Sequence, residues 1–217
     1  MLIFEGMKRV LKFLFLKLLR KAAARFSSAP DKAKVHEALS QLLKAAEDTK
    51  DKRSLLLSIN PAIQPVIIFS DQHKGARNAK DDFKKAEKNY LAALSYYEQQ
   101  KYFLIDLGDS EELWKNSVGT IMKSNKEIFF LEKKFIARNA FCKVIGNHDL
   151  FWKEDPFAPF YLKKMYDEKI PVYESIVLKY KTGQMDFKIL CTHGHQGDRQ
   201  SDGNAFSKWF VSKIWGP

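Results

Sequence analysis

Four short apolar runs stand out along the chain, because they are rich in β-branched and aromatic residues and lack helical spacing. They cover residues 65–70, 102–106, 141–145 and 187–191. Runs of this length and composition predict strands that are buried in a layered α/β domain.

Amphipathic segments separate the first three runs. Residues 78–101 carry apolar side chains at spacings of three and four, which predicts a helix with one apolar stripe, and residues 121–141 repeat the pattern. Alternation of strand and helix is typical of a parallel sheet. Further along, we expect a short helix near 161–168, then two strands at 173–180 and 185–191 that are joined by a hairpin turn, so part of the sheet structure is antiparallel.

A polar motif follows each of the four apolar runs. The motifs are Asp71-Gln72-His73, Gly108-Asp109-Ser110-Glu111-Glu112, Gly146-Asn147-His148-Asp149 and Thr192-His193-Gly194-His195. Open α/β sheets bind their ligands at the carboxyl ends of strands. We therefore expect the four motifs to meet at one edge of the sheet.

The residue types in these motifs are those of a two-metal site. In an extended segment, Asp71 and His73 project to the same side and can bind one ion together. Asp109 is the natural bridging ligand, because its carboxylate has two oxygens. Asn147 and His193 would bind the second ion. Mixed oxygen and imidazole donors suit Mn, Fe or Zn better than Ca or Mg.

Two ions held in this way predict hydrolysis of a phosphate ester by a metal-bridged hydroxide, because neighbouring ions lower the pKa of bound water and stabilise an in-line displacement. His148 is adjacent to a ligand. We assign it as the general acid for the leaving alkoxide, and we expect Asp149 to orient it.

The ordered set of motifs resembles the calcineurin-like metallophosphoesterase superfamily, whose pattern is Asp-x-His, Gly-Asp-x-x-Asp/Glu, Gly-Asn-His-Asp/Glu, a later His and a final Gly-His-x-His. The resemblance covers residues 65–198. It implies an α/β fold with a double β-sandwich flanked by helices, a dinuclear metal centre, and hydrolysis of phosphomonoesters, phosphodiesters or pyrophosphates. By position, it gives the substrate-contacting role to His148 and a supporting role to Glu112. It gives the metal-ligand role to Asp71, His73, Asp109, Asn147 and His193.

The final Gly-His-x-His of the pattern has no separate match in this sequence. We interpret residues 192–195 as the fourth motif, because many small members of the superfamily place Thr-His-Gly-His directly after an apolar strand; the alternative is that these residues stand in for the fifth. Residues 204–215 predict an amphipathic helix. We therefore expect the sequence to be incomplete at its C-terminus.

Three further side chains near the motifs are candidates for a supporting or substrate-binding role. His195 is either another ligand or a neighbour that contacts a ligand or the substrate phosphate. Lys74 and Arg77 follow the first motif and are placed to meet the phosphate, although a solvated helix start is the simpler interpretation.

The N-terminal part of the chain differs from the rest in its charge. Of a net charge of +11, the first 25 residues carry seven basic residues against one acidic residue, a net of +6. The pattern predicts a basic amphipathic helix that lies on an anionic membrane surface or packs on its own domain. Its longest apolar run, 13–16, is too short to span a bilayer. Nucleic acid is a weaker candidate partner, because stacking aromatics are few here.

These patterns divide the 217 residues into a helical basic extension and linker at 1–60 and a metallophosphoesterase domain at 61–217. Cys142 and Cys191 fall inside predicted buried strands, which favours thiols in a reducing compartment. We expect a cytoplasmic protein that is at most peripheral at the inner face of the membrane. The sequence leaves the oligomeric state open.

Three functions of different classes fit these patterns. The first is a metal-dependent phosphoesterase. The second is a membrane-associated hydrolase of UDP-diacylglucosamine-type pyrophosphates, which the amphipathic N-terminus favours. The plain His148 in the third motif disfavours it, because typical members of that branch carry arginine there. The third is a metal-binding protein that is catalytically incomplete because the last motif is absent.

Overall fold

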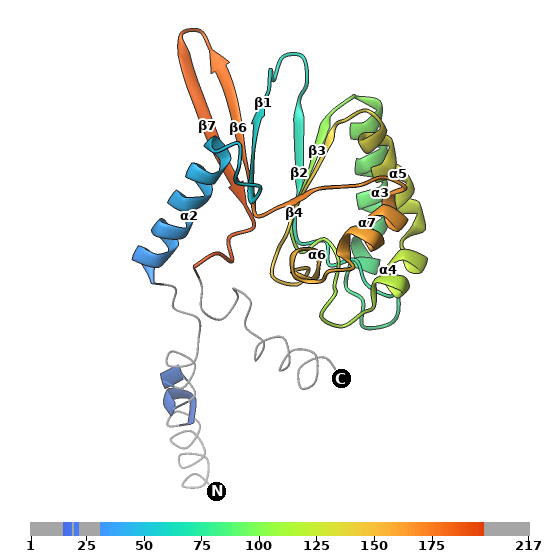
Figure 1. The fold of residues 1–217 in the computed structure, drawn as a ribbon. Coiled ribbons are helices and arrows are strands. Elements are labelled where there is room, and N and C mark those ends of the chain that lie inside the picture. The colour runs from blue at the N-terminus through green and yellow to red at the C-terminus, as the bar shows by residue number, and fades with distance from the viewer. Residues whose placement is uncertain (1–14, 19, 22–30, 198–217) are drawn as a thin grey trace, which may run out of the picture.

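Two β-sheets stack face to face at the centre of the molecule, and helices lie on their outer sides (Figure 1). The computed structural model describes residues 15–18, 20–21 and 31–197. Ile105 and Val144 from one sheet pack with Ile176 from the other, and all three are fully buried. The double β-sandwich flanked by helices, which the resemblance implies, is confirmed.

The larger sheet contains the first three predicted strands. It consists of β2 (Val66–Phe69), β3 (Phe103–Leu107), β4 (Phe141–Val144) and the short β5 (Val172–Tyr173), in this order and all parallel. The crossover helices α3 (Phe83–Gln99) and α5 (Lys126–Ala137) cover its outer face (Figure 1). The parallel sheet places the ends of β2, β3 and β4 side by side, and the first three motifs begin there.

The stretch for which one helix was predicted, residues 121–141, holds the end of α4 (Val118–Ser124) and the whole of α5. Asn125 lies between the two helices with φ −118° and ψ 31°. Its buried Nδ2 donates to the carbonyl oxygen of Ile121 at 3.0 Å and to that of Gly75 at 2.8 Å. Because an asparagine side chain can compete for backbone hydrogen bonds, it ends α4 here and ties the break to the loop after β2.

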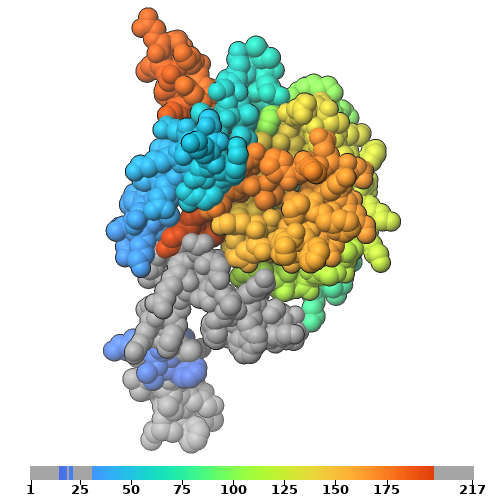
Figure 2. Space-filling view, viewed as in Figure 1, coloured from blue at the N-terminus to red at the C-terminus, as the bar shows by residue number. Residues whose placement is uncertain are grey.

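The smaller sheet holds a strand that the sequence pattern did not reveal. β1 (Ser54–Ser58) pairs in parallel with β6 (Ser175–Thr182), and β6 forms an antiparallel hairpin with β7 (Met185–Thr192). The predicted hairpin turn therefore exists. Its tip projects beyond the body of the molecule in the space-filling view (Figure 2), and Met185 there is 62% exposed.

Helix α2 (Lys32–Glu47) covers the smaller sheet. Asp31 caps its start, because Oδ1 accepts a hydrogen bond from the backbone nitrogen of Ala33 at 2.9 Å. Leu42 and Ala45 are buried on the side where α2 contacts β1 and β6. Residues 31–58 thus form part of the sandwich, although they lie within the range predicted to be an extension and linker.

Two short helices follow the third motif, α6 (Phe151–Glu154) and α7 (Ala158–Tyr166). They bury Trp152, Leu162 and Met165 in a core shared with α4 and α5. α7 ends where Asp167 takes a left-handed conformation, with φ 62°, so it lies slightly earlier than the helix predicted near 161–168. Ile145, which directly precedes the third motif, packs in the same core.

Two predicted helices fall wholly or largely outside the described residues. The helix at 204–215 lies outside them entirely. Of the N-terminal helix only residues 15–18 and 20–21 are described, and these are helical. Among the residues that the structure describes, no helix is both long and apolar enough to cross a membrane.

Candidate metal centre

The loops after β2 and β3 are hydrogen-bonded to each other. The backbone nitrogens of His73 and Lys74 donate to the carbonyl oxygens of Asp109 and Ser110, both at 2.8 Å. Asp71, His73 and Asp109 have φ of 58°, 49° and 50°, in the left-handed region that is unfavourable for residues other than glycine. The extended geometry expected for Asp71 and His73 is therefore wrong. A strained turn brings them together instead, with Nε2 of His73 lying 3.9 Å from Oδ1 of Asp71.

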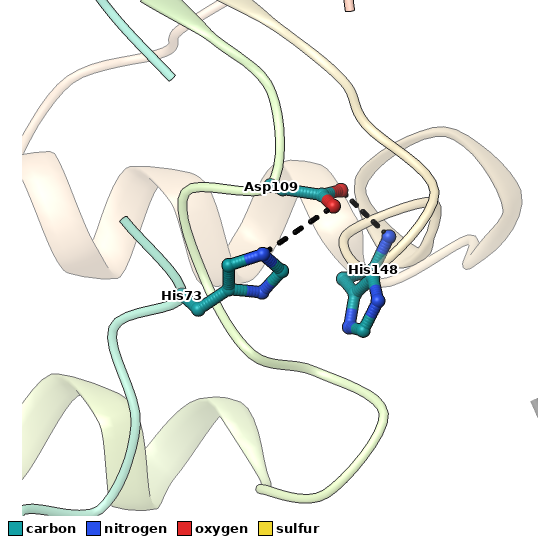
Figure 3. A group of neighbouring side chains, drawn as sticks. All are labelled: His73, Asp109 and His148. Carbon is teal, nitrogen blue, oxygen red and sulfur yellow. Dashed lines mark hydrogen bonds and ion pairs between the residues drawn. The ribbon is translucent and has the colours of Figure 1, made fainter. Parts of the chain in front are cut away.

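Asp109 lies at the centre of the site and is almost fully buried. Its Oδ2 is 3.6 Å from Nε2 of His73, and its Oδ1 accepts a hydrogen bond from the backbone nitrogen of His148 at 2.8 Å (Figure 3). Nε2 of His193 approaches Oδ2 to 3.4 Å. Asp109 thus belongs to two groups whose ligand atoms lie within 4.8 Å of one another, one with His73 and His148 and one with Asp71 and His193. A carboxylate shared in this way has the placement of a bridging ligand.

The two groups combine the candidate ligands differently from the sequence-based prediction, which placed Asp71 and His73 on the same ion. Asp71 faces His193, with Oδ1 and Nε2 3.5 Å apart, whereas His73 lies toward His148, with ring centroids 4.6 Å apart. Asn147 is half-buried in the loop after β4, next to His148. Its role as a ligand stays a prediction.

His195 lies behind His193 and is buried. The Nδ1 atoms of the two rings are 3.2 Å apart, so one donates to the other. This contact fixes the ring of His193 while its Nε2 faces Asp71 and Asp109. Of the two roles expected for His195, support of a neighbouring ligand fits this position better.

Glu112 holds the rings of two histidines. Its carboxylate lies 3.1 Å from Nδ1 of His148 and 3.4 Å from Nδ1 of His73. Burial alone would raise the pKa of Glu112, but the hydrogen bonds from His148 and His73 outweigh burial and lower the pKa to about 2. Burial lowers the pKa of His73, but Glu112, Asp109 and Asp71 together raise it above the usual value. Trp114 stacks on His148 with ring centroids 4.0 Å apart, which restricts the ring further.

Asp149, which was expected to orient His148, has other partners. Its Oδ1 accepts from the backbone nitrogen of Gly146 at 2.6 Å, and its Oδ2 accepts from that of Ser110 at 2.9 Å. The fully buried carboxylate therefore joins the loops after β3 and β4. The acid at the ring of His148 is Glu112 instead.

Lys74 and Arg77, the two candidate phosphate contacts, both face carboxylates. Lys74 is fully buried, with Nζ 2.9 Å from Oε1 of Glu132 and 3.2 Å from Oε1 of Glu111. Arg77 donates through Nε to Oε2 of Glu87 at 3.0 Å and forms an ion pair with the same carboxylate. Lys74 is therefore turned away from the site, and the role in substrate binding does not fit it.

A buried network of charged side chains lies beneath the motif loops, and sequence reasoning missed it. Lys143 in β4 bonds Asp106 in β3 at 2.6 Å and Glu111 at 2.9 Å, and all three are buried. Burial raises the pKa of Glu111, but the charges of Lys143 and Lys74 outweigh burial and hold the pKa below its ordinary value. The signal was present in the sequence, because Asp106 and Lys143 interrupt apolar strands where a charge needs a buried partner.

A cavity of about 420 Å³ opens beside His73, Glu112 and His148. Lys80 and Lys115 also line it, together with the acidic side chains of Asp81 and Asp82. The cavity thus lies open to a ligand directly beside the candidate metal ligands.

Comparison with protein families gives one match. The family model of calcineurin-like phosphoesterases matches residues 64–214, which include all four motif loops. The chain belongs to the calcineurin-like phosphoesterase family. No curated protein and no solved structure matches the chain significantly. Membership of the family confirms the superfamily that the four motifs indicated.

The donors of this calcineurin-like phosphoesterase fit divalent metal ions. Two groups of three side chains converge on Asp109, and each combines carboxylate oxygens with imidazole nitrogens. Such mixed donors suit divalent transition metals. The residues around Asp109 thus form a candidate metal centre.

Proposed function

We propose that the protein hydrolyses a phosphomonoester, phosphodiester or pyrophosphate with the help of two Mn, Fe or Zn ions. The residues that would hold them are Asp71, His73, Asp109, Asn147 and His193. The observation that carries this proposal is that Asp109 belongs to two groups of ligand atoms at the edge of the sheet. When bound, such ions supply an activated water and neutralise charge on the phosphate.

His148 would hold a proton for the leaving oxygen. Its Nδ1 is engaged by Glu112, and the stacked Trp114 limits rotation of the ring. Nε2 then remains for the substrate. A general acid needs this kind of fixed orientation, because the proton must be within hydrogen-bond reach of the atom that receives it.

The cavity next to the site supports a substrate that carries phosphate. Lys80 and Lys115 line it together with the two histidines His73 and His148. The two lysines would pair with phosphate oxygens, beside the acidic Asp81 and Asp82 of the same cavity. The identity of the alcohol or second phosphate group would depend on the rest of this cavity.

Turnover of bis-p-nitrophenyl phosphate in the presence of Mn²⁺ tests the proposed activity. We expect Asp109→Asn to lower kcat/KM at least about 100-fold, because the shared carboxylate loses its charge. Asp186→Asn is a matched control on the projecting hairpin, where Asp186 is 47% exposed and faces Lys181. We expect it to keep wild-type turnover. A wild-type protein that binds fewer than two ions and gives no turnover would instead support the third function, a catalytically incomplete metal-binding protein.

We further propose that the N-terminal helix binds an anionic membrane surface at its cytoplasmic face. Phe15 and Leu18 in this helix are 63% and 67% exposed, and basic residues such as Lys17 and Arg20 lie beside them. Exposed apolar and basic side chains on one helix favour an interfacial position. The free thiols of Cys142 and Cys191 are consistent with the cytoplasm. A lipid-linked pyrophosphate would then be the favoured substrate.

Sedimentation with vesicles tests this membrane proposal. We expect the protein to sediment with vesicles that contain phosphatidylglycerol and to stay in solution with neutral vesicles. The double variant Phe15→Ser, Leu18→Ser should lose sedimentation, whereas Met185→Ser, which removes an equally exposed apolar side chain, should not. Equal sedimentation of the double variant and the wild type would contradict the proposal.

A further inference from the structure

Glu111 is the meeting point of the buried network beneath the motif loops. The residue is fully buried, yet its carboxylate receives four hydrogen-bond donors. Oε1 lies 3.2 Å from Nζ of Lys74 and accepts from Oγ of Ser110 at 3.1 Å. Oε2 lies 2.9 Å from Nζ of Lys143 and accepts from Nε1 of Trp152 at 2.8 Å. Each of the two carboxylate oxygens thus accepts from two donors.

The donors come from the segments that carry the candidate metal ligands. Lys74 directly follows His73, in the loop after β2. Lys143 lies in β4, and Trp152 lies in α6 directly after the third motif. Glu111 itself follows Asp109 by two residues. One carboxylate therefore joins the three segments on which His73, Asp109 and Asn147 depend.

The remaining partners of the network lie farther from the motifs. Glu132 in α5 bonds Lys74 at 2.9 Å and accepts a hydrogen bond from the hydroxyl of Tyr166 at 3.0 Å. Tyr90 donates at 3.4 Å to Oε1 of Glu132, the oxygen that also bonds Lys74. Apart from Lys74, these groups belong to helices of the core and not to the motif loops. Glu132 is thus a matched comparison for Glu111, because both are buried carboxylates of one network.

Burial of a carboxylate costs free energy unless all its hydrogen bonds are made. Even a fully bonded buried ion pair adds little to stability compared with apolar side chains, so stability alone does not explain Glu111. The hydrogen bonds of Glu111 also fix the distances between the segments that carry the candidate ligands. A metal centre needs these distances to be set before an ion binds. Removal of a residue that hydrogen-bonds a metal ligand often changes metal affinity about 10- to 100-fold, and Glu111 acts one contact further out, by fixing the segments that carry the ligands. We propose that Glu111 is a positioning residue that holds the loops of His73, Asp109 and Asn147 in a metal-ready arrangement.

Metal affinity of the 217-residue chain tests this role without any use of turnover. The dissociation constant for Mn²⁺ would be measured by competition with a fluorescent chelator, and the melting temperature of the metal-free protein would be measured in parallel. We expect Glu111→Gln to weaken Mn²⁺ binding at least about 10-fold. Glu132→Gln should lower the melting temperature by a similar amount but change the affinity by less than about threefold.

Trp152→Phe provides a milder variant for the case in which Glu111→Gln does not fold. It keeps an aromatic ring in the core and removes the donor to Oε2 of Glu111. We expect it to weaken Mn²⁺ binding about three- to tenfold. Wild-type affinity in Trp152→Phe, or in a folded Glu111→Gln protein, would overturn the positioning role and leave the proposed function intact. This role rests on the proposed metal centre, so a wild-type protein that binds no Mn²⁺ would overturn both.

Discussion

The position of His148 fits two different roles, that of a general acid and that of a metal ligand. Glu112 engages Nδ1, which suits a general acid, whereas the grouping of His148 with His73 and Asp109 would also suit a metal ligand. We expect His148→Asn to keep two Mn²⁺ ions per chain and to lower kcat about 100-fold or more for an alkyl phosphate ester. The loss should be smaller for a p-nitrophenyl ester, because nitrophenolate leaves without a proton.

Metal analysis and the two assays on the purified variant check this prediction. Asp186→Asn serves as the control in the same preparations. If His148→Asn retained only one ion, His148 would be a ligand and the general-acid role would be wrong.

The pair of Glu112 and His73 makes the stability of the metal-free protein depend on pH. The pKa of Glu112 is about 2 in the fold against 4.5 as the ordinary value, so its contribution is present above pH 4.5 and is lost as pH falls toward 2. The pKa of His73 is raised above 6.5, so its contribution is present below pH 6.5 and is lost as pH rises through the folded value. We expect maximal stability between these limits.

Denaturant unfolding in a chelator at a series of pH values measures this profile. Glu112→Gln should reduce the acid-side loss by about 3 kcal/mol for a shift of this size, and the share of Glu111, whose pKa is also lowered, should remain. If the free energy of unfolding of Glu112→Gln fell with decreasing pH as steeply as that of the wild type, other carboxylates would be the cause of the acid-side loss.

The sequence identified the motif residues but not all of their partners. Asp109 could be placed at the centre because of its position after a strand, and both groups of ligand atoms contain it. Glu112 and Asp149 were harder to assign, since each is an acid within reach of the motif loops and only the three-dimensional path of the chain shows which one meets His148. Lys74 was misjudged because its neighbours in the sequence are polar, whereas its neighbours in space are buried carboxylates.

At the scale of elements, the site depends on how closely the ends of β3 and β4 approach each other. A methyl group on Gly146 would overlap the carboxylate and the backbone nitrogen of Asp109. We therefore expect Gly146→Ala to displace Asp109 and to weaken Mn²⁺ binding by about 10-fold or more. Titration of the variant with Mn²⁺ checks this.

Gly119 in α4 is the matched control for Gly146. A methyl group there would meet nothing closer than 4.0 Å, and alanine is the better helix former. Gly119→Ala should bind Mn²⁺ as the wild type does. Unchanged binding in Gly146→Ala would mean that the loop moves aside without cost to the site.

Helices and strands with a clear hydrophobic pattern were predicted from the sequence. Features that depend on contacts with distant parts of the chain were not. β2, β3 and β4 are apolar runs between amphipathic helices, so their type and order follow from the sequence. β1 was missed because its five residues follow a charged segment and become a strand through pairing with β6. The break at Asn125 was missed because it depends on a hydrogen bond to Gly75, fifty residues away in the chain.

At the scale of the whole molecule, metal binding should be linked to folding, because the ligands come from both sheets. His193 follows β7 of the smaller sheet, whereas His73 and Asp109 follow strands of the larger one. We expect Mn²⁺ at about 100 times its dissociation constant to raise the free energy of unfolding by about 2.7 kcal/mol for each ion. Denaturant unfolding with Mn²⁺ and with a chelator measures the difference.

Asp109→Asn provides the control for this linkage. Its free energy of unfolding should be nearly the same with Mn²⁺ and with chelator, since the shared ligand is lost. Equal stabilisation of the variant and the wild type by Mn²⁺ would place the ions elsewhere in the molecule.

The most direct test of the central claim is electron paramagnetic resonance during a Mn²⁺ titration, because two ions that share the Asp109 carboxylate must be magnetically coupled. We expect the wild-type protein to bind two ions per chain and to develop a spin-coupled signal as the second ion binds, and we expect Asp109→Asn to lack that signal. Uncoupled Mn²⁺ at full occupancy, or a coupled signal that persists in Asp109→Asn, would contradict a dinuclear centre built around Asp109.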